Sequence, residues 1–252
     1  MAACAVSEGV WAEMKPIGSS NIWVEFAGHK NTEYGVELLS MPTRPHPALK
    51  GDSIDIPGRD GKLFMSEDAY DRVLVSLRMI AVNGNMDAVN DWLTGSGKLR
   101  FGDEPNRAYD AMVTKEFSVS NRNDRLVGRE FSVTFDCSPY RYEYPETAAV
   151  TLTTSGGIVT NPGTVYSQPR IKLTGSGDIT LGIGEYSIEA TGLTDGAIID
   201  SDLQEVFSLD GLESRNAYFT MDEFPRLSPG TNIISWTGNV TKVEIEPRGR
   251  YL

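Results

Sequence analysis

Alternating apolar and polar side chains, which are typical of half-buried β-strands, recur along most of this chain. The clearest case covers residues 129–137, where Phe131, Val133 and Phe135 share one face. A long aliphatic run at 72–82 predicts a central strand. Further strands are predicted at 98–101 and 109–119, and a hairpin is predicted from the β-rich runs 22–28 and 34–40.

One segment instead has the three- and four-residue spacing of an α-helix. Val89 and Trp92 belong to an apolar series with this spacing, Asn85 is a suitable N-cap, and Gly95 ends the pattern. The sequence therefore predicts one helix between these two polar ends. Core packing is the expected role of Trp92, and also of Trp23 in the first apolar run.

The stretch 54–63 breaks from a short strand into a tight turn and leaves in a second apolar run. Pro57 fixes one φ angle and Gly58 frees the next, so the chain reverses sharply and holds Arg59 and Asp60 at the bend. Taken alone, such a turn is usually the solvated tip of a hairpin. Three prolines shortly before it exclude a helix there and favour an extended connection.

The second half of the chain has no helical pattern, only short β-runs punctuated by glycine. Regular short strands with turn signals between them argue for a β-sandwich. An aromatic, proline-bracketed stretch at 138–145 is typical of an ordered linker before this region. Separate strands are predicted at 149–153, 170–174, 178–183, 187–190, 197–200, 232–236 and 240–245.

Together these elements predict a mainly β protein with two domains. Residues 21–141 are expected to form a mixed sheet or split barrel with one α-helix, and residues 142–252 to form the sandwich. Residues 1–20 have no clear period and are interpreted as an N-terminal arm. A chain of 252 residues is long enough to bury two ordinary cores.

Composition narrows the classes of function. With 40% hydrophobic and 23% charged residues, the chain is typical of a globular protein. No apolar run is long enough to span a bilayer and the start lacks a secretory signal, so membrane insertion is not expected. The net charge of -12 gives neither half a basic footprint, which argues against sequence-specific nucleic-acid binding.

Catalytic and metal-binding patterns are weak. His29 and His46 lack a second ligand at a suitable spacing. Cys4 and Cys137 lie far apart, so neither a disulfide scaffold nor a metal cluster is indicated. The Gly-Ser-Gly segments match neither a nucleophile elbow nor a phosphate-binding loop and are interpreted as turns. We therefore expect no enzymatic activity, no cofactor and no metal.

Two groups of side chains leave alternatives open. Asp200, Asp202 and Glu205 are candidate calcium ligands, but the segment lacks the central glycine and terminal glutamate of such loops, so a hairpin tip is favoured. Tyr218 and Trp236 are candidate glycan contacts, because an aromatic ring offers apolar area to a sugar. Core packing is the competing interpretation for Trp236.

Taken in order, several stretches over about residues 22–252 resemble the distal tail proteins of long, non-contractile-tailed bacteriophages. The most specific is the Pro-Gly-Arg-Asp-Gly turn at 57–61. The N-terminal arm is a departure, since such proteins commonly begin near the strand at residue 22. The other matching stretches are 26–28, 34–36, 91–93, 99–101, 109–111, 135–139, 161–163, 167–171, 198–200, 224–232 and 245–252.

This resemblance implies a structural subunit of the tail-tip or baseplate hub. Such proteins form a six-fold ring that continues the tail tube and lets DNA pass, with an outer sandwich resembling galectins and carbohydrate-binding modules. The implied partners are other copies of the chain, the tail tube protein, the tape-measure protein, tail-tip or tail-associated proteins and receptor-binding proteins. The implied location is the distal end of the tail in the virion, after assembly in the host bacterial cytoplasm.

A closed ring requires two different complementary surfaces on each subunit. The turn residues are expected at the ring or tube interface, with Arg59 pairing with an acidic residue of a neighbour. The alternative is a carbohydrate-binding protein that serves host-cell adsorption. The expected interface residues are Asp55, Ile56, Pro57, Gly58, Arg59 and Asp60.

Overall fold

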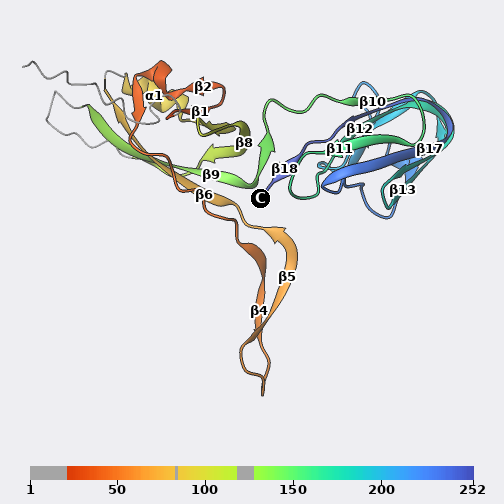
Figure 1. Ribbon diagram of the computed structural model, residues 1–252, viewed down its shortest axis with the longest axis horizontal. Coiled ribbons are helices and arrows are strands. Elements are labelled where there is room, and N and C mark those ends of the chain that lie inside the picture. The colour runs from red at the N-terminus through yellow and green to blue at the C-terminus, as the bar shows by residue number, and fades with distance from the viewer. Residues whose placement is uncertain (1–21, 83–84, 118–127) are drawn as a thin grey trace, which may run out of the picture.

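The computed structural model describes residues 22–82, 85–117 and 128–252, which form two sheet-based domains and a long hairpin (Figure 1). The fold is mainly β with a single α-helix among the described residues, as predicted. The predicted N-terminal arm at 1–20 lies outside the described residues, and so does the end of the strand predicted at 109–119.

The first domain is built on an eight-stranded sheet that curls as a half-barrel. Its order is β2-β1-β7-β8-β9-β6-β3, and β18 also pairs with β9. Every recorded pairing among these described strands is antiparallel. The sequence predicts a mixed sheet, and in this respect the prediction is wrong. The strands are β1 (Val24–Phe26), β2 (His29–Lys30), β3 (Val36–Leu38), β6 (Val73–Ala81), β7 (Ser96–Phe101), β8 (Glu104–Val113), β9 (Arg129–Glu143) and β18 (Arg250–Tyr251).

The core of this domain lies on one face of the sheet, as the alternation predicts. Along β6 every second side chain is buried, and Leu77 lies opposite the equally buried Val133 of β9. Helix α1 (Met86–Trp92) adds its apolar side to this core, and the side chain of Asn85 accepts a hydrogen bond from the Asp87 N–H, which confirms the predicted cap. Trp92 is buried, and its indole N–H donates to the Phe26 carbonyl at 3.1 Å.

The predicted hairpin between residues 22–28 and 34–40 is wrong. Strand β1 pairs with β2 and β7, whereas β3 pairs with β6 near the other end of the sheet order. The chain turns early at Gly28, whose φ is 85°, and then passes through the 3-10 helix η2 (Asn31–Tyr34). The buried Asn31 accepts from the Val24 N–H and donates to the Val36 carbonyl, so it joins β1 and β3 where no ladder does.

The core role predicted for Trp23 is also wrong. This side chain is half-buried, and it is not part of the buried cluster of the first domain. The Lys30 ammonium lies 4.7 Å and the Arg100 guanidinium carbon 5.6 Å from the ring centroid. Trp23 is therefore a surface ring flanked by two cations.

Strands β4 (Leu49–Asp55) and β5 (Lys62–Tyr70) form a separate two-stranded sheet, hereafter the long hairpin. It projects away from both domains (Figure 1). The turn at 57–61 is its tip, as predicted: the Arg59 N–H donates to the Ile56 carbonyl at 3.1 Å, and Gly58 and Gly61 have φ angles of 79° and 76°. The tip is solvent-exposed throughout.

The second domain is a sandwich whose two layers share the long strands β12 and β17. The first half of β17 pairs with β11, and the second half of β12 pairs with β13, which in turn pairs with β16. The second half of β17 pairs with β10, and the first half of β12 pairs with β14, which in turn pairs with β15. The two strands also pair with each other along most of their length. Its core is buried between the layers. The elements are β10 (Val150–Leu152), β11 (Gly157–Asn161), β12 (Arg170–Ile183), β13 (Tyr186–Leu193), β14 (Gly196–Asp200), β15 (Glu205–Phe207), η3 (Asn216–Tyr218), β16 (Phe219–Thr220) and β17 (Gly230–Glu246).

The separate strands predicted at 170–174 and 178–183, and at 232–236 and 240–245, are each one continuous strand. The turn expected at the Gly-Ser-Gly of 175–177 is a bulge inside β12, where the pairing with β17 shifts register. Gly238 has a φ of 93°, and a Cβ there would lie 2.3 Å from the Asp178 carbonyl oxygen. Glycine thus bends both strands from one layer into the other without ending them.

The linker predicted at 138–145 is wrong over most of its length, because β9 continues to Glu143. The predicted division between residues 141 and 142 therefore falls inside a strand. The described part of the chain has one buried cluster on each side of this region, the first ending at Cys137 and the second beginning at Val159. The chain returns at its end, where β18 pairs with β9 of the first domain.

Candidate functional site

One face of the long hairpin carries three solvent-exposed apolar side chains, beside Asp52, the cross-strand partner of Met65. Ile54 and Leu63 are direct cross-strand partners, and Met65 follows two residues after Leu63 on the same face. Their exposed fractions are 43%, 36% and 55%. Apolar side chains so placed mark an interaction surface when they lie together on one element. We call these three residues the apolar face of the hairpin.

The opposite face of the hairpin is polar apart from Phe64. Lys62 and Asp55 are cross-strand partners, with 3.2 Å between the Nζ and Oδ2 atoms. Phe64 lies over Gly51, where an added Cβ would lie 2.7 Å from the ring and 2.2 Å from the Met65 carbonyl oxygen. The two strands and this ring are therefore closely fitted only because residue 51 has no side chain.

A two-stranded hairpin without a covering layer has little stability of its own in water. The apolar face of this one is uncovered in the single chain, and both strands are edge strands with free backbone groups. A partner that covers the apolar face would supply the missing layer. The hairpin is thus the candidate surface for contact with another molecule.

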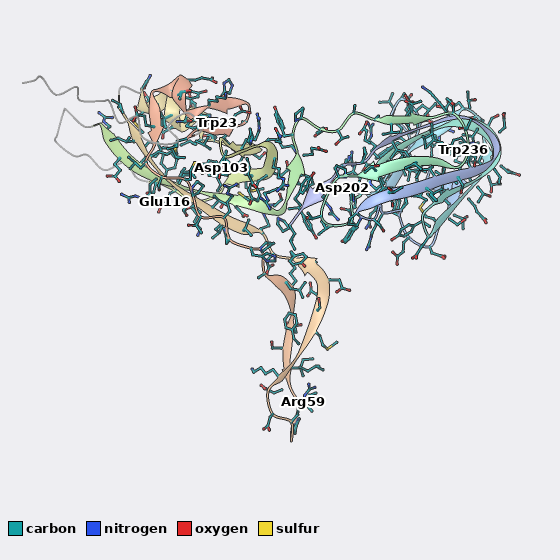
Figure 2. All side chains as sticks on the ribbon, in the orientation of Figure 1. Trp23, Arg59, Asp103, Glu116, Asp202 and Trp236 are labelled. Carbon is teal, nitrogen blue, oxygen red and sulfur yellow. The ribbon has the colours of Figure 1, made fainter. Side chains whose placement is uncertain are left out.

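The structure brings the six sequence-predicted interface residues together at the end of this hairpin. Arg59 marks the tip, far from the two domains (Figure 2). Asp55 is engaged with Lys62, and Arg59 and Asp60 are exposed beside it. Sequence reasoning missed the apolar face, because alternating apolar residues normally indicate a buried face. Only the structure shows that no other element of the single chain covers this one.

The structure does not bring Tyr218 and Trp236 together. Trp236 pairs across strands with the buried Leu181, so it points toward the sandwich interior and packs against its core. Tyr218 is 41% exposed and directly precedes β16, which is separated from β17 by β12 and β13. Three strand spacings correspond to about 14 Å, so one sugar ring cannot stack on both.

A cavity of about 250 Å³ lies at the junction of the two domains. Lys98, Asp110 and Tyr142 line it from the first domain. Asp202, which is labelled in Figure 2, and Arg248 line it from the second. Lys98 pairs with Asp110 at 2.9 Å and lies over the Tyr142 ring. Burial, followed by the charge of Asp110, raises the pKa of Tyr142 to about 12. The Tyr142 hydroxyl therefore stays protonated near neutral pH.

The residues considered for metal binding have other partners. The Nδ1 atom of His29 lies 3.0 Å from a Glu33 carboxylate oxygen, and that of His46 lies 2.9 Å from the Pro47 carbonyl oxygen. Asp200 accepts hydrogen bonds in the turn between β14 and β15, the hairpin tip that the sequence favours. No group of at least three potential ligands is present in the described residues.

Comparison with solved structures finds the same fold in a phage protein. One matching solved structure is described as the crystal structure of SPP1 Dit (gp 19.1), a paradigm of the hub adsorption apparatus in phages infecting Gram-positive bacteria. The TM-score is 0.70 with 16% sequence identity, and the match covers 91% of this chain and 99% of that one. At this identity the likeness establishes the fold.

Neither a family model nor a curated protein matches the sequence. No helix within the described ranges is long and apolar enough to cross a membrane. The predicted fold class, a mainly β chain with one helix, is confirmed by the structure, and the fold is similar to that of the SPP1 Dit protein.

Proposed function

We propose that this chain is a structural subunit of a phage tail tip, which assembles as a closed ring between the tail tube and the tip. The observation that carries this proposal is the exposed apolar face of the long hairpin, on a fold similar to that of a phage hub protein. The ring is six-fold, and it is located at the distal end of the tail after assembly in the host cytoplasm.

In this ring the long hairpin of one copy lies against the next copy. Its apolar face is the donor surface, and a different surface of the neighbour receives it, as a head-to-tail ring requires. Covering Ile54, Leu63 and Met65 removes apolar area from water and completes the unsupported two-stranded sheet. Arg59 pairs with a carboxylate of the neighbour, and Asp60 with a cationic group.

The work of such a ring is mechanical. The first domain joins the tail tube, surrounds the path of the tape-measure protein and then DNA, and the second domain is a platform for tail-tip and receptor-binding proteins. No reaction is assigned to it. Two charge pairs on the first sheet support passage, because Arg78 and Arg100 are engaged by acidic neighbours rather than open to a phosphate backbone.

The decisive experiment measures the mass of the purified chain by light scattering and images the same sample by negative stain. We expect rings with a central channel. Leu63→Asp, which places a charge on the apolar face, is expected to shift the mass to that of the monomer. The matched control Ser53→Asp adds the same charge on the opposite face and is expected to keep the ring.

Reversal of both tip charges, in the double variant Arg59→Glu and Asp60→Arg, tests the tip separately. We expect it to weaken ring formation, and rings as stable as those of the wild type would contradict the pairing assigned to Arg59. A wild-type chain that stays monomeric at every concentration would contradict the self-assembling ring. A glycan array on that sample would then test the carbohydrate-binding alternative.

A further inference from the structure

The last strand of the chain lies between the two domains and the root of the long hairpin. Strand β18 pairs with β9, with Arg250 opposite Tyr142 and Tyr251 opposite Arg141. On its other side, the Thr164 N–H of the second domain donates to the Arg250 carbonyl at 3.0 Å. The strand is thus held by backbone bonds from both domains.

The Arg250 side chain is buried at this junction, with 6% of the residue exposed. Its Nε and Nη2 atoms donate to the Tyr166 carbonyl at 3.0 and 2.8 Å, and Nη1 donates to Gln168 at 2.9 Å. The guanidinium carbon lies 4.3 Å from the Tyr140 ring centroid and 4.5 Å from that of Tyr166. Arg250 therefore fixes a ring of the first domain and a segment of the second at once.

The Tyr140 ring continues this contact into the long hairpin. Tyr70, the last residue of β5, meets Tyr140 edge to face with 6.0 Å between centroids. His46, in the segment that enters β4, meets Tyr70 at 6.4 Å. An unbroken row of side chains therefore runs from the hairpin root through Arg250 to the second domain.

A second row ends on the same strand. The Leu252 carbonyl accepts from Arg141 at 3.1 Å, and Arg141 donates to a Glu104 carboxylate oxygen at 2.7 Å. Arg44, also in the segment entering β4, donates to that same oxygen at 2.7 Å. The first row begins at Tyr70 and His46, and the second begins at Arg44. The segments before and after the hairpin are therefore both connected to residues 250–252.

The backbone of the second domain is packed closely against the strand. A Cβ at Gly163 would lie 2.3 Å from the Arg250 carbonyl oxygen, and a Cβ at Gly249 would lie 2.8 Å from the Pro162 ring. Packed groups of this kind pass a displacement on to their neighbours. A joint with these contacts moves as one piece.

We propose that β18 is a strap that couples the root of the long hairpin to the second domain. When the hairpin is fixed, the direction in which the second domain projects is fixed with it, and loosening either end loosens the other. This coupling belongs to the single chain. Its use rests on the proposed function, where fixing the hairpin in a ring would align every second domain around that ring.

The test measures two distances by spin labelling in the full-length chain carrying Leu63→Asp, the substitution expected to keep it monomeric. One pair of labels, at Asn90→Cys and Thr191→Cys, spans the two domains, and the other, at Asn90→Cys and Ser53→Cys, spans the first domain and the hairpin. Cys4→Ser removes one native thiol. Cys137 is buried, which raises its pKa to about 12 and keeps it unreactive.

In this monomeric background, without further substitution, we expect narrow distance distributions for both pairs. Arg250→Ala should broaden both, although Arg250 does not touch the hairpin. Arg250→Lys keeps the charge and the strand but lacks the planar fork, so it should broaden them as well. The matched control is Arg226→Ala, because Arg226 also lies over the Tyr166 ring, at 4.7 Å, without touching the strap; it should leave both distributions narrow.

The reciprocal variant acts from the other end. Tyr70→Leu removes the ring at the hairpin root and should broaden the distance between the two domains, because a coupling acts equally in both directions. If Arg250 variants broaden only the interdomain distance, or if Tyr70→Leu leaves that distance unchanged, the coupling is refuted. Since every measurement is made on monomers, loss of ring formation neither mimics nor hides this result.

Discussion

Asp200 is a buried carboxylate at the end of β14, and Arg248 stabilises its negative charge. The Arg248 guanidinium donates to both carboxylate oxygens, at 2.8 and 3.0 Å, and two backbone N–H groups donate to Oδ1. Burial alone would raise the pKa of Asp200, but the hydrogen bonds and charge of Arg248 outweigh it, and the pKa lies below its usual value. The carboxylate therefore stabilises the fold while it is ionised.

Asp200→Asn is expected to lower the free energy of unfolding by about 2 kcal/mol at pH 7, since it removes a charged acceptor from Arg248. In the unfolded chain the carboxyl has a pKa of about 3.9. Because the folded pKa is lower, the contribution is complete above that value and is lost as the pH falls through the folded pKa. Urea unfolding from pH 7 to pH 3 should show the variant and wild type converging.

The exposed Asp202→Asn is the control for this series and should behave as the wild type at every pH. A difference between Asp200→Asn and the wild type that stays constant down to pH 3 would contradict the role of the ionised carboxylate.

Single residues were predictable from sequence where the signal is local. Trp92 belongs to a helical series, and the cap at Asn85 and the apolar neighbours all lie within one short segment. Trp23 lies in no such local pattern. The Arg100 that flanks it comes from β7, which is distant in sequence and lies near Trp23 only in the folded chain. The same holds for Arg250, whose partners Tyr140 and Tyr166 are distant in sequence.

At the scale of elements, the long hairpin shows both the reach and the limit of the sequence. The Pro-Gly-Arg-Asp-Gly turn is encoded by its own residues, and the structure forms it at the tip. Whether Ile54 and Leu63 face a core depends on what packs against them, which no local pattern contains. The bends in β12 and β17 were misread as breaks for a related reason: glycine permits both, and only the partner strands decide.

Gly51→Ala is expected to disrupt the long hairpin alone. The added Cβ would lie 2.2 Å from the Met65 carbonyl oxygen, so the strands must part or slip in register. Limited proteolysis should cut residues 49–70 faster than in the wild type, while the thermal midpoint of both domains stays unchanged. Ser53→Ala, on the same strand without a close contact of that kind, is the control; equal cleavage of the two variants would contradict the prediction.

At the scale of the whole molecule, the chain has two buried cores, and the short strand β18, the proposed strap, contacts both domains. The sequence indicated both cores, because each is built from strands with a clear apolar face. It did not indicate the strap, since residues 248–252 form too short a run to show a period. Their packing depends on side chains from both domains, so only the folded chain displays it.

Two matched core substitutions should show whether these cores unfold separately. Leu77→Ala in the first core and Leu173→Ala in the second each remove a fully buried side chain, at a cost of about 2–5 kcal/mol. In the Leu63→Asp background, which removes association, calorimetry should resolve two transitions, and each variant should lower one of them by about 10 °C. A single transition that moves with either variant would mean that the strap joins the cores into one cooperative unit, and adding Arg250→Ala should then split it.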